Sequence, residues 1–558
     1  MPLRRLAFAA LCLALAALPL LAAHGILARD GLGALDLLLL LTLAGLAPWL
    51  ALAAGNALLG LAIRLLARDP AAFVTPPLRA TTGAPPGTRT ALAVCLRNED
   101  MAAVIPPLEA LLDGLPAPHF ELWFLSDTTA APHRSAEDAA VEALRALRPA
   151  DAARIHLRRR AANTGFKAGN VMEFLDQQGA RFDFMLSLDA DSAMSPAAVR
   201  RLVAAMEASP RTAILQQLIV GRPVAQPFPR LFQFGMRAGM RAWATGQAWW
   251  QGPQGPYWGH NALIRVAAFR DHAKLDALPD GSAILSHDQV EAVRLHQAGW
   301  EVWCVPEEEG SLEGNPPALP EFLARDLRWA EGNMQYLALL RTPGLGLMAR
   351  WQLAQAVLLF ACAPLWVLAF ALAAILAATG GLDAAGGLAL AGLCLLVWAL
   401  VNAPKLVGYA ELLLRPARAA AYGGRAMVAR GAALELLFSA VLQPVRAVHQ
   451  AGFLAVLPFG LRMGWKPQNR ADRGVGWADA ARLLWPHTLA AALALWFVAA
   501  TAPWALWFAV PWMGGLLLAI PYAVITSEAR VGAALAARGL AATPEEVQAR
   551  SGSAASAA

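Results

Sequence analysis

Long apolar stretches without a charged residue lie at both ends of this chain and enclose a middle third of mixed composition. The longest of them cover residues 37–63, 351–382, 384–404 and 486–527. About 20 apolar residues suffice for a helix to cross the hydrocarbon core of a bilayer, so each stretch can supply one or two spans. The sequence therefore predicts a bundle of membrane helices that carries one folded domain.

The number of spans depends on two further stretches. Residues 6–23 follow Arg4 and Arg5 as in a signal peptide, but the second apolar stretch comes so soon that a two-span hairpin is the better interpretation. Pro503 is expected to divide 486–527 into two helices, which gives six spans. Residues 436–461 contain polar side chains and predict either two short spans or an interfacial helix.

Charge supports a membrane protein of defined orientation. Charged residues make up 15% of the 558 residues, whereas soluble proteins contain about 25%. Most loop arginines flank one side of the predicted bundle and residues 380–387 contain none, so the middle domain and both termini are expected to face the cytoplasm. The short run Arg158–Arg160 is more typical of a solvated strand end than of phosphate contact, and nucleic acid is not an expected partner. The five cysteines have no metal-ligand spacing and are expected to be free thiols.

The expected domains follow from these boundaries. Residues 1–70 form a two-span hairpin, 71–347 a cytoplasmic domain, 348–530 a C-terminal membrane region with a segment 420–482 at its interface, and 531–558 a partly disordered tail. Within the middle domain, short apolar runs alternate with helical patterns, which predicts a mainly parallel sheet covered on both faces. Its strands are expected at 91–96, 121–125, 155–157, 182–188, 214–220 and 302–305.

Polar residues follow several of these strands, where parallel sheets bind ligands. Asn98 and Glu99 follow the first strand, Asp127 the second, and Asp189 and Asp191 the fourth. Two carboxylates separated by one residue point to the same side of an extended segment and suit Mg²⁺ or Mn²⁺ bound to a diphosphate. The alternative is a strand-ending turn in which Asp191 caps the next helix.

A third carboxylate, Asp288, lies in the segment Leu285-Ser286-His287-Asp288 before a predicted helix. It can cap that helix, and it can also serve as a general base that accepts a proton from an attacking hydroxyl. The two roles are compatible, because a helix N-terminus holds a base rigidly. His287 is expected to be structural.

Aromatic residues suggest contacts to sugar rings. Trp329 can be core or a stacking platform, and Arg325 and Arg328 beside it can bind a diphosphate. Trp249, Trp250, Tyr257 and Trp258 form a second cluster, which favours a carbohydrate groove over a core strand. Together with the carboxylates, this order of residues between membrane segments predicts an enzyme that builds a polysaccharide at a membrane.

Lysine use adds one further indication. The chain has four lysines, Lys167, Lys274, Lys405 and Lys466, against a large excess of arginine. Lys167 lies in the glycine-bracketed segment Gly165-Phe166-Lys167-Ala168-Gly169-Asn170, which suits close approach to a nucleotide. Chance is an equally good explanation for the other positions, and Lys405 can snorkel from a span end.

The motifs resemble those of membrane-embedded family 2 glycosyltransferases, the group that includes cellulose and hyaluronan synthases, and within it the glucans biosynthesis glucosyltransferase H family. The resemblance covers roughly residues 37–482 and depends on five segments. They are Leu186-Ser187-Leu188-Asp189-Ala190-Asp191-Ser192, Tyr257-Trp258-Gly259-His260-Asn261-Ala262, Leu285-Ser286-His287-Asp288, Ala298-Gly299-Trp300-Glu301-Val302-Trp303, and Arg325-Asp326-Leu327-Arg328-Trp329-Ala330-Glu331-Gly332-Asn333.

The resemblance implies a GT-A-type (Rossmann-like) α/β domain inserted in an α-helical transmembrane bundle of a bacterial inner membrane. It also implies a metal-dependent, inverting and processive glucosyltransferase that uses UDP-glucose, with Asp288 as base and Asp189 and Asp191 on the metal and diphosphate. The residues implied to contact the UDP-sugar are Asn98, Glu99, Asp127, Lys167, Asn170, Asp189, Arg325, Arg328, Lys466 and Arg470. Those implied to contact the acceptor are Trp329, Trp258, His260 and Asn261.

The implied product is the linear β-1,2-linked backbone of osmoregulated periplasmic glucans, exported through the helices of 348–530. Residues 465–470 are implied to form a gating loop that closes over the donor, and a periplasmic glucan-processing protein and acyl carrier protein are implied as partners. The superfamily usually has Gln where this chain has Arg325, so contacts at the acceptor end are expected to differ. The alternatives are an enzyme that loads one sugar onto a lipid phosphate, another cellulose- or hyaluronan-like synthase, and a polysaccharide conduit without activity.

Overall fold

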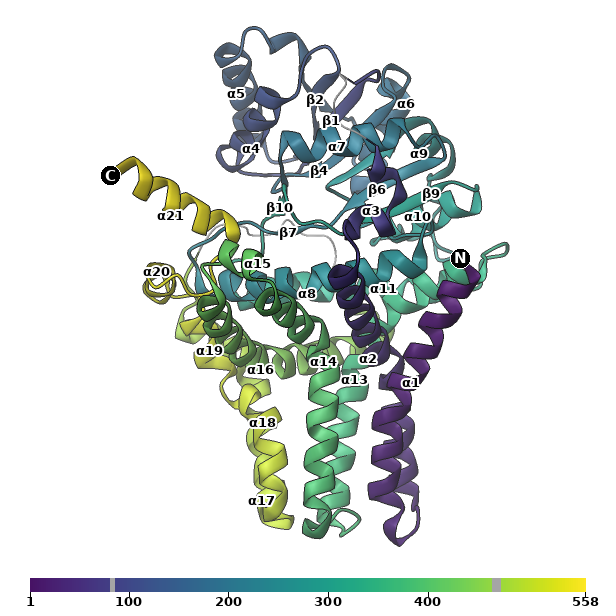
Figure 1. Cartoon of the computed structure of the whole chain (residues 1–558), viewed down its shortest axis with the longest axis vertical. Helices are drawn as coiled ribbons and strands as arrows, with labels where there is room; N and C mark the ends of the chain where they lie inside the picture. The colour runs from purple at the N-terminus through teal and green to yellow at the C-terminus, as the bar shows by residue number, and fades with distance from the viewer. Residues whose placement is uncertain (81–85, 464–472, 558) are drawn as a thin grey trace.

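The computed structural model describes residues 1–80, 86–463 and 473–557. A sheet-containing domain lies at one end of the molecule and a bundle of long helices extends away from it (Figure 1). The N-terminus lies near the level at which the two parts meet, and the C-terminus lies beside the sheet-containing domain. The order of elements along the chain is therefore two helices of the bundle, the α/β domain, and the rest of the bundle.

The α/β domain contains a seven-stranded sheet with the order β3-β2-β1-β4-β8-β6-β9. Only β8 runs antiparallel to its neighbours β4 and β6. All six predicted strands are present, and β8 and three short strands were not predicted. The strands are β1 (Thr90–Leu96), β2 (Phe120–Ser126), β3 (Ile155–Arg159), β4 (Phe184–Asp189), β6 (Thr212–Gln217), β8 (Ala262–Arg265) and β9 (Glu301–Val305). The short strands β5 (Ala193–Met194), β10 (Ser311–Glu313) and β7 (Val220–Gly221) form a second sheet in that order.

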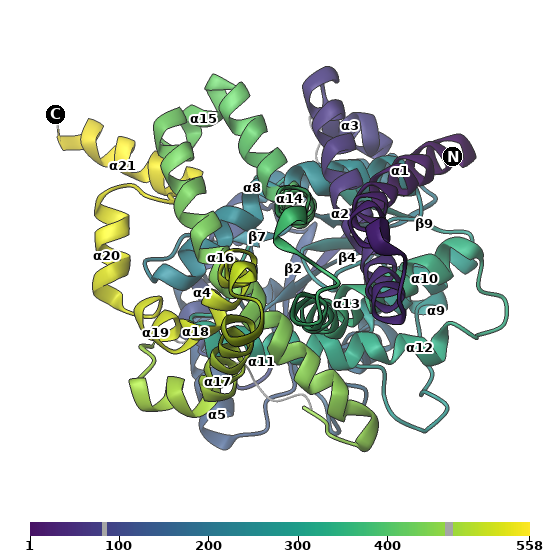
Figure 2. The ribbon, with the colours of Figure 1, turned by 90° about the horizontal axis from the view of Figure 1, so that it is seen from below.

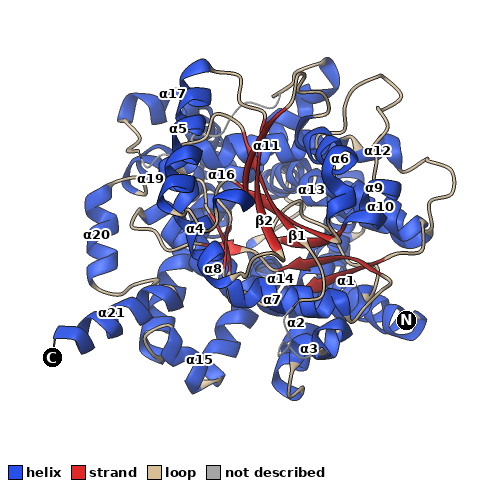
Figure 3. Ribbon diagram, turned by 90° about the horizontal axis from the view of Figure 1, so that it is seen from above, coloured by secondary structure: helices blue, strands red, loops and turns tan. Residues whose placement is uncertain are grey.

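Helices cover both faces of the large sheet, as Figure 3 shows from above. On one face α4 (Met101–Gly114), α5 (Ala131–Leu147) and α7 (Pro196–Glu207) pack through buried residues such as Leu108, Leu144 and Leu202. On the other face α6 (Phe166–Gln178), α9 (Val266–His272) and α10 (Asp288–Gln297) contribute a second buried cluster. The carboxyl ends of β1, β2 and β4 share one edge, because Leu96 pairs with Ser126 and Cys95 with Asp189.

In the described residues, six helices are long and apolar enough to cross a membrane, and a seventh span is possible from a helix pair bent by 51°. The six are α1 (Pro2–Leu27), α2 (Ala34–Leu66), α13 (Leu347–Ala378), α14 (Gly387–Leu414, with the preceding turn), α16 (Arg425–Val456, with the following turn) and α17 (Trp477–Thr501). The bent pair is α18 (Leu506–Leu517), with the turn before it, and α19 (Ala519–Ile525). The predicted break at Pro503 is present, since α17 ends at Thr501.

Most of the ambiguous stretch 436–461 belongs to the single helix α16, which ends at Val456 and is followed by a helical turn at Leu457–Phe459. Seen from below, α13 and α14 are viewed along their axes, whereas α16 lies across them (Figure 2). Its central residues include Gln443, Arg446 and Gln450, which are polar side chains that a lipid-facing span would not carry. By length and composition α16 is one of the six helices that could cross a membrane, so the interfacial alternative stays a prediction.

The helix α8 (Pro227–Gln251) joins the α/β domain to the bundle and was not predicted. It crosses α2 and α14 so closely that side chains are excluded at the crossing points. A methyl group on Gly60 would collide with the carbonyl of Ala242, and one on Gly408 with the carbonyl of Ala238. Small residues at helix crossings allow this backbone contact, as is common in membrane bundles.

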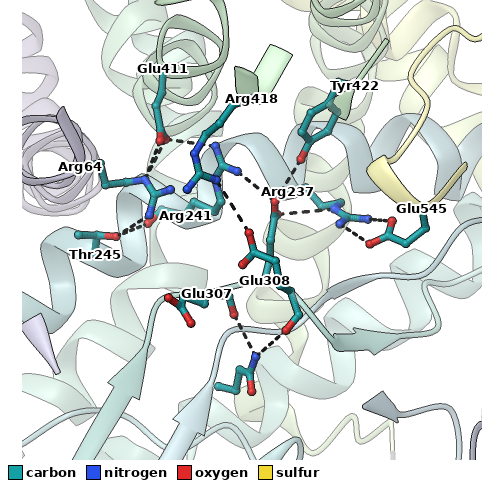
Figure 4. A network of polar contacts seen from close by, with 12 residues as sticks. Arg64, Arg237, Arg241, Thr245, Glu307, Glu308, Glu411, Arg418, Tyr422 and Glu545 are labelled. Atoms are coloured by element: carbon teal, nitrogen blue, oxygen red, sulfur yellow. Dashed lines mark hydrogen bonds and ion pairs between the residues drawn. The ribbon is translucent and has the colours of Figure 1, made fainter. Parts of the chain in front are cut away.

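A chain of buried ion pairs runs through this junction (Figure 4). Arg64 of α2 donates to both carboxylate oxygens of Glu411 on α14, each at 2.9 Å. Arg241 of α8 lies 3.4 Å from Glu411 and 3.1 Å from Glu308, which belongs to the loop after β9. Arg237, one helical turn earlier, lies 3.6 Å from Glu308. All five side chains are nearly inaccessible to solvent, so each charge depends on its neighbours.

The C-terminal helices extend this network. The tail 531–558 was expected to be partly disordered, yet the structure has α20 (Ala529–Ala537) and α21 (Pro544–Ala557) there. Glu545 accepts two hydrogen bonds from Arg237, at 2.7 and 2.9 Å, and Glu546 pairs with Arg230 of α8. The remaining helices are α3 (Pro70–Val74), α11 (Leu319–Met334), α12 (Tyr336–Leu339) and α15 (Pro416–Ala421).

Replacing Glu545 and Glu546 together by Gln should destabilise the protein, because Arg237 and Arg230 are fully buried and would lose anionic partners. Removing one partner of a buried ion pair costs about 3–5 kcal/mol, and partial exposure of Glu545 reduces this to about 1–3 kcal/mol. We expect a lower thermal midpoint of the detergent-solubilised protein. The matched control is Glu142→Gln at an exposed ion pair, and an equal effect of both variants would contradict the argument.

Candidate active site

The carboxylate pair lies at the end of β4, where Asp189 is the last residue of the strand. The backbone N–H of Asp189 donates to Ser192 Oγ at 3.0 Å and tightens the turn that follows. The next helix, α7, is capped by Ser195, whose hydroxyl accepts from Ala198 N. The alternative in which Asp191 caps this helix is therefore wrong, and Asp191 lies beside Gly314 after β10.

Lys167 connects the carboxylate pair to a second segment of the site. It lies in the first turn of α6, after Gly165 and Phe166, which adopt positive φ angles of 69° and 51°. Its Nζ pairs with Asp189 and donates to the carbonyl of Gly259 at 2.8 Å. Burial by itself would lower the pKa of Lys167, but Asp189, with smaller contributions from neighbours such as Asp288, raises it, and the pKa lies above its ordinary value. Lys167 is therefore a permanent positive charge in the site.

The carbonyl of Gly259 accepts hydrogen bonds from three donors. Besides Lys167, it accepts from Ser187 Oγ at 2.9 Å and from the Tyr257 hydroxyl at 3.1 Å. Gly259 has a φ of 88°, and a Cβ on it would lie 3.4 Å from Cγ of Asp288. The glycine therefore gives the backbone its conformation and lets Asp288 approach.

Asp288 is the first residue of α10, one position earlier than predicted, and His287 is the N-cap. His287 Nδ1 lies 2.9 Å from Glu291 on the next turn, so His287 is structural in this arrangement. Burial lowers the pKa of His287, but the carboxylates of Glu291 and Asp288 together raise it, and the net pKa is above its ordinary value. The Tyr336 hydroxyl donates to the carbonyl of Ser286 at 2.6 Å and fixes the approach to Asp288.

His260, which follows Gly259, lies close to Glu313, a residue that the sequence did not lead us to predict. His260 Nε2 lies 3.4 Å from Glu313 on β10, and Nδ1 of the same ring lies 3.3 Å from Ser192 Oγ. Burial raises the pKa of Glu313, and so does the charge of Asp191 and Asp189 nearby. The sequence signal that could have identified Glu313 is its position directly before Gly314 and shortly before the Arg328-Trp329 motif.

The predicted acceptor residues divide into exposed and buried groups. Trp329 is 43% exposed on α11, and Arg325 stacks over its ring at 4.5 Å from the ring centroid. Burial lowers the pKa of Arg325. Asn261 is fully buried and donates to Ser311 Oγ at 3.0 Å, so it supports β10. The partly buried Trp258 packs against the apolar cluster near α8.

The residues predicted to contact the nucleotide lie at the ends of β1 and β2. Asp127 accepts two hydrogen bonds from Arg160, at 2.7 and 2.6 Å, and is nearly buried. Asn170 is also buried and donates to the carbonyl of Leu125 at 3.1 Å. Asn98 has a positive φ of 58°, which turns the chain at the strand end. Asn170 therefore supports the nucleotide side of the site from within the domain.

The remaining residues predicted to contact the UDP-sugar lie in a loop, in a helix or outside the described residues. Glu99 follows Asn98 in the same loop, and Arg328 is a buried residue of α11. Lys466 and Arg470 lie outside the described residues, as does the whole of the expected gating loop 465–470. The interpretation of Arg158–Arg160 as a solvated end is wrong, because Arg158 pairs with Glu173, Arg159 with Glu137, and Arg160 with Asp127.

The aromatic groove predicted around Trp249 and Trp250 is also wrong for these two residues. Trp250 is buried, stacks on Phe8 of α1 at 4.7 Å, and donates to Asn56 of α2 at 2.8 Å. Trp249 lies under the guanidinium of Arg4, 5.2 Å from the ring centroid. Both side chains lie near the end of α8 and connect it to α1 and α2.

The donor set suits a divalent cation shared with a substrate. Among the described residues, no three His, Cys, Asp or Glu side chains converge as a complete protein-only metal site. Asp189 and Asp191 are hard oxygen ligands, and Mg²⁺ is commonly held by one or two carboxylates together with substrate phosphates. Burial is the main cause of the raised pKa of Glu313 beside this pair, and the charges of Asp191 and Asp189 raise it further. The residues therefore fit a metal–diphosphate complex.

Comparison with known proteins identifies the family. Residues 93–273 match the model for glycosyl transferase family 2, and residues 184–403 match glycosyl transferase family group 2. A mannosyltransferase from Pyrobaculum calidifontis, solved with GDP-Man and Mn²⁺, aligns with 65% of this chain and 98% of its own at 17% identity and a TM-score of 0.40.

Two relatives are similar over most of the chain, and both are named glucans biosynthesis glucosyltransferase H. The protein from Xanthomonas oryzae pv. oryzae is 33% identical over 93% of this chain and 83% of its own length. The one from Caulobacter vibrioides is 34% identical over 82% of this chain and 73% of its own. This extent of similarity, together with the site at the sheet edge, shows that the chain belongs to the glucans biosynthesis glucosyltransferase H family of membrane-embedded family 2 glycosyltransferases.

Proposed function

We propose that this protein is an inverting, processive glucosyltransferase that polymerises glucose from UDP-glucose into a linear β-1,2-linked glucan. The proposal includes passage of the product across a bacterial inner membrane, with the catalytic domain and both termini in the cytoplasm. One observation carries it most: Asp288 and the Asp189–Lys167 pair approach the same backbone segment at Gly259 from different elements. This geometry supports a base and a diphosphate site that act on the same donor sugar.

In the proposed reaction, Asp288 accepts the proton of an acceptor hydroxyl. The hydroxyl oxygen attacks the anomeric carbon of glucose, the bond from that carbon to the diphosphate breaks, and UDP leaves with the bonding electrons. Attack opposite to the leaving group inverts the anomeric configuration. Asp288 is rigid in this role because it begins α10 and because the segment before it is tied to Tyr336.

Asp189 and Asp191 would hold Mg²⁺ or Mn²⁺ with the diphosphate. The metal, when bound, neutralises charge that develops on the leaving group. Lys167 keeps Asp189 in place and adds a positive charge of its own. Arg325 supplies another nearby, at a distance from the exposed ring of Trp329 that is typical of a cation–π contact. The acceptor sugar would stack on this ring, since sugar faces are apolar.

Retention of the growing chain is supported by the position of the site next to the bundle. Asp326 of α11 accepts a hydrogen bond from Arg446 of α16 at 3.0 Å and another from Gln450. Farther along, Gln443 donates to Asn402 of α14 at 3.1 Å. Polar side chains between membrane helices are costly and commonly mark the path of a polar substrate. A series of such contacts leads from the helix of Trp329 into the bundle.

Replacing Asp288 by Asn should abolish transfer and leave UDP binding intact, because the amide keeps the shape of the side chain but cannot accept the proton. General-base catalysis contributes about 10²–10⁴-fold, so turnover should fall at least that far. Release of UDP and incorporation of labelled glucose measure it. Asp276→Asn at an exposed position is the control, and retained polymerisation in the Asp288 variant would refute the base assignment.

Replacing Lys167 by Met should reduce kcat/KM by about 10–100-fold, the usual effect of losing a residue that orients a metal ligand. The concentration of Mg²⁺ needed for half-maximal activity should rise, because Asp189 would no longer be held. Arg at this position should not restore activity, since its planar fork cannot replace a compact ammonium group. Lys274→Met is the matched control, because Lys274 forms an exposed ion pair. Unchanged metal dependence in the Lys167 variant would contradict this role.

The first test of the whole proposal is incubation of membrane-reconstituted protein with radiolabelled UDP-glucose and Mg²⁺, followed by linkage analysis. A long glucan of 2-linked glucose is the expected product. One glucose on a lipid phosphate would replace the proposal by the single-transfer alternative. Failure to incorporate glucose in a preparation that binds UDP would refute glucose polymerisation by this chain alone.

A further inference from the structure

A cavity of about 550 Å³ lies on the flank of the molecule, outside the catalytic site. Its walls come from the end of α2, from α3 and the turn after it, and from Trp249 at the end of α8. Leu59, Ile63 and Leu66 form one face of α2 along this cavity, at the spacing of successive helical turns. The lining is therefore mainly apolar, although it lies next to the cytoplasmic domain.

The level of this cavity follows from the length of α2. The helix has 33 residues and is about 50 Å long, whereas the hydrocarbon core of a bilayer is about 30 Å thick. If the core begins after Asp36, about 20 residues carry the helix across it, to about residue 57. Leu59–Leu66 therefore extends past the hydrocarbon core. The crossing with α8 at Gly60 lies at the same level, which is expected for a helix along the membrane surface.

Two arginines supply positive charge to the cavity. Arg68 and Arg79 both line it, and both are exposed. Arg79 Nε donates to the carbonyl of Ala72 at 3.3 Å, which holds its guanidinium over α3. Within the described part of the chain, neither arginine forms an ion pair. The acidic residue in the lining, Asp69, caps α3 through a 2.9 Å hydrogen bond from Ala72 N.

Apolar residues at the rim face outward rather than into a protein core. Leu66 is 85% exposed and Phe73 is 43% exposed. Exposed apolar side chains beside arginines, at the headgroup level of a bilayer, match a molecule with an acyl chain and a phosphate. Guanidinium groups bind phosphate oxygens in a bidentate manner, and anionic headgroups are further favoured by the net positive charge of the lining.

We propose that this cavity binds one anionic phospholipid of the leaflet next to the catalytic domain. Arg68 and Arg79 contact the headgroup phosphate, and an acyl chain lies along Leu59, Ile63 and Leu66. The bound lipid fills the angle between α2, α3 and α8, the same helix that carries Arg237 and Arg241. The inference is independent of the sugar that the enzyme transfers.

The test measures lipid binding directly. Delipidated protein in detergent is titrated with dioleoyl phosphatidylglycerol or with dioleoyl phosphatidylcholine, and bound lipid is counted by native mass spectrometry. We expect one tight phosphatidylglycerol per chain and weaker binding of phosphatidylcholine. The double variant R68Q/R79Q should bind phosphatidylglycerol about thirtyfold more weakly, from the typical contribution of two basic residues at a membrane surface.

Further variants separate this site from general attraction of lipids to basic residues. Ala62→Phe fills the cavity from an exposed position of α2 and should weaken binding while the arginines remain. R430Q/R482Q removes two exposed arginines elsewhere and should bind phosphatidylglycerol as the unchanged protein does. Equal binding by R68Q/R79Q and the unchanged protein would overturn the proposal. So would equal loss in R68Q/R79Q and R430Q/R482Q, or no preference for the anionic lipid.

Discussion

The buried ion chain from Arg64 to Glu545 is the constraint on which the relation between the two parts of this protein depends. It includes charges from α2, α14, α8, the loop after β9, and α21, segments far apart in the sequence (Figure 4). A hydrophobic contact would tolerate sliding of these elements, but a buried guanidinium that loses its carboxylate is strongly destabilised. The network therefore fixes the orientation of the α/β domain relative to the bundle. It does so because each ion pair requires a particular orientation of its side chains as well as a short distance.

The buried ion pairs are connected to the active site through a short segment of backbone. Glu308 lies in the loop that leads from β9 into β10, and the carbonyl of Gly310 in that loop accepts from Ser195 N at 2.8 Å. Since β10 pairs with β5, which follows Asp191, the loop and the carboxylate turn lead into adjacent strands of one small sheet. Glu313 then extends from the end of β10 toward His260. The bundle thus determines the position of the carboxylate pair through backbone that is held on both sides.

Sequence reasoning singled out site candidates where the signal lies in their own segment. Asp189 and Asp191 were recognisable because a buried strand ends at them, and Asp288 because it begins a helix. It failed where the role depends on a distant partner. Trp250 was expected near carbohydrate, but its partners Phe8 and Asn56 are nearly 200 residues or more away in the chain. The glycines of α8 weaken its helical pattern, and the backbone contacts they permit exist only once α2 and α14 are in place.

Lys167 illustrates how a single residue type can be required by geometry. A compact ammonium group can contact the Asp189 carboxylate and the Gly259 carbonyl at once, because its three donors rotate freely about one nitrogen. The guanidinium of an arginine is wider and directs its donors in a plane, which suits Arg160 on Asp127 and Arg237 on Glu545. In a chain that otherwise prefers arginine for ion pairs, lysine stands where the carboxylate pair, the glycine segment and Asp288 converge. The choice of cation is thus part of the chemistry of the site.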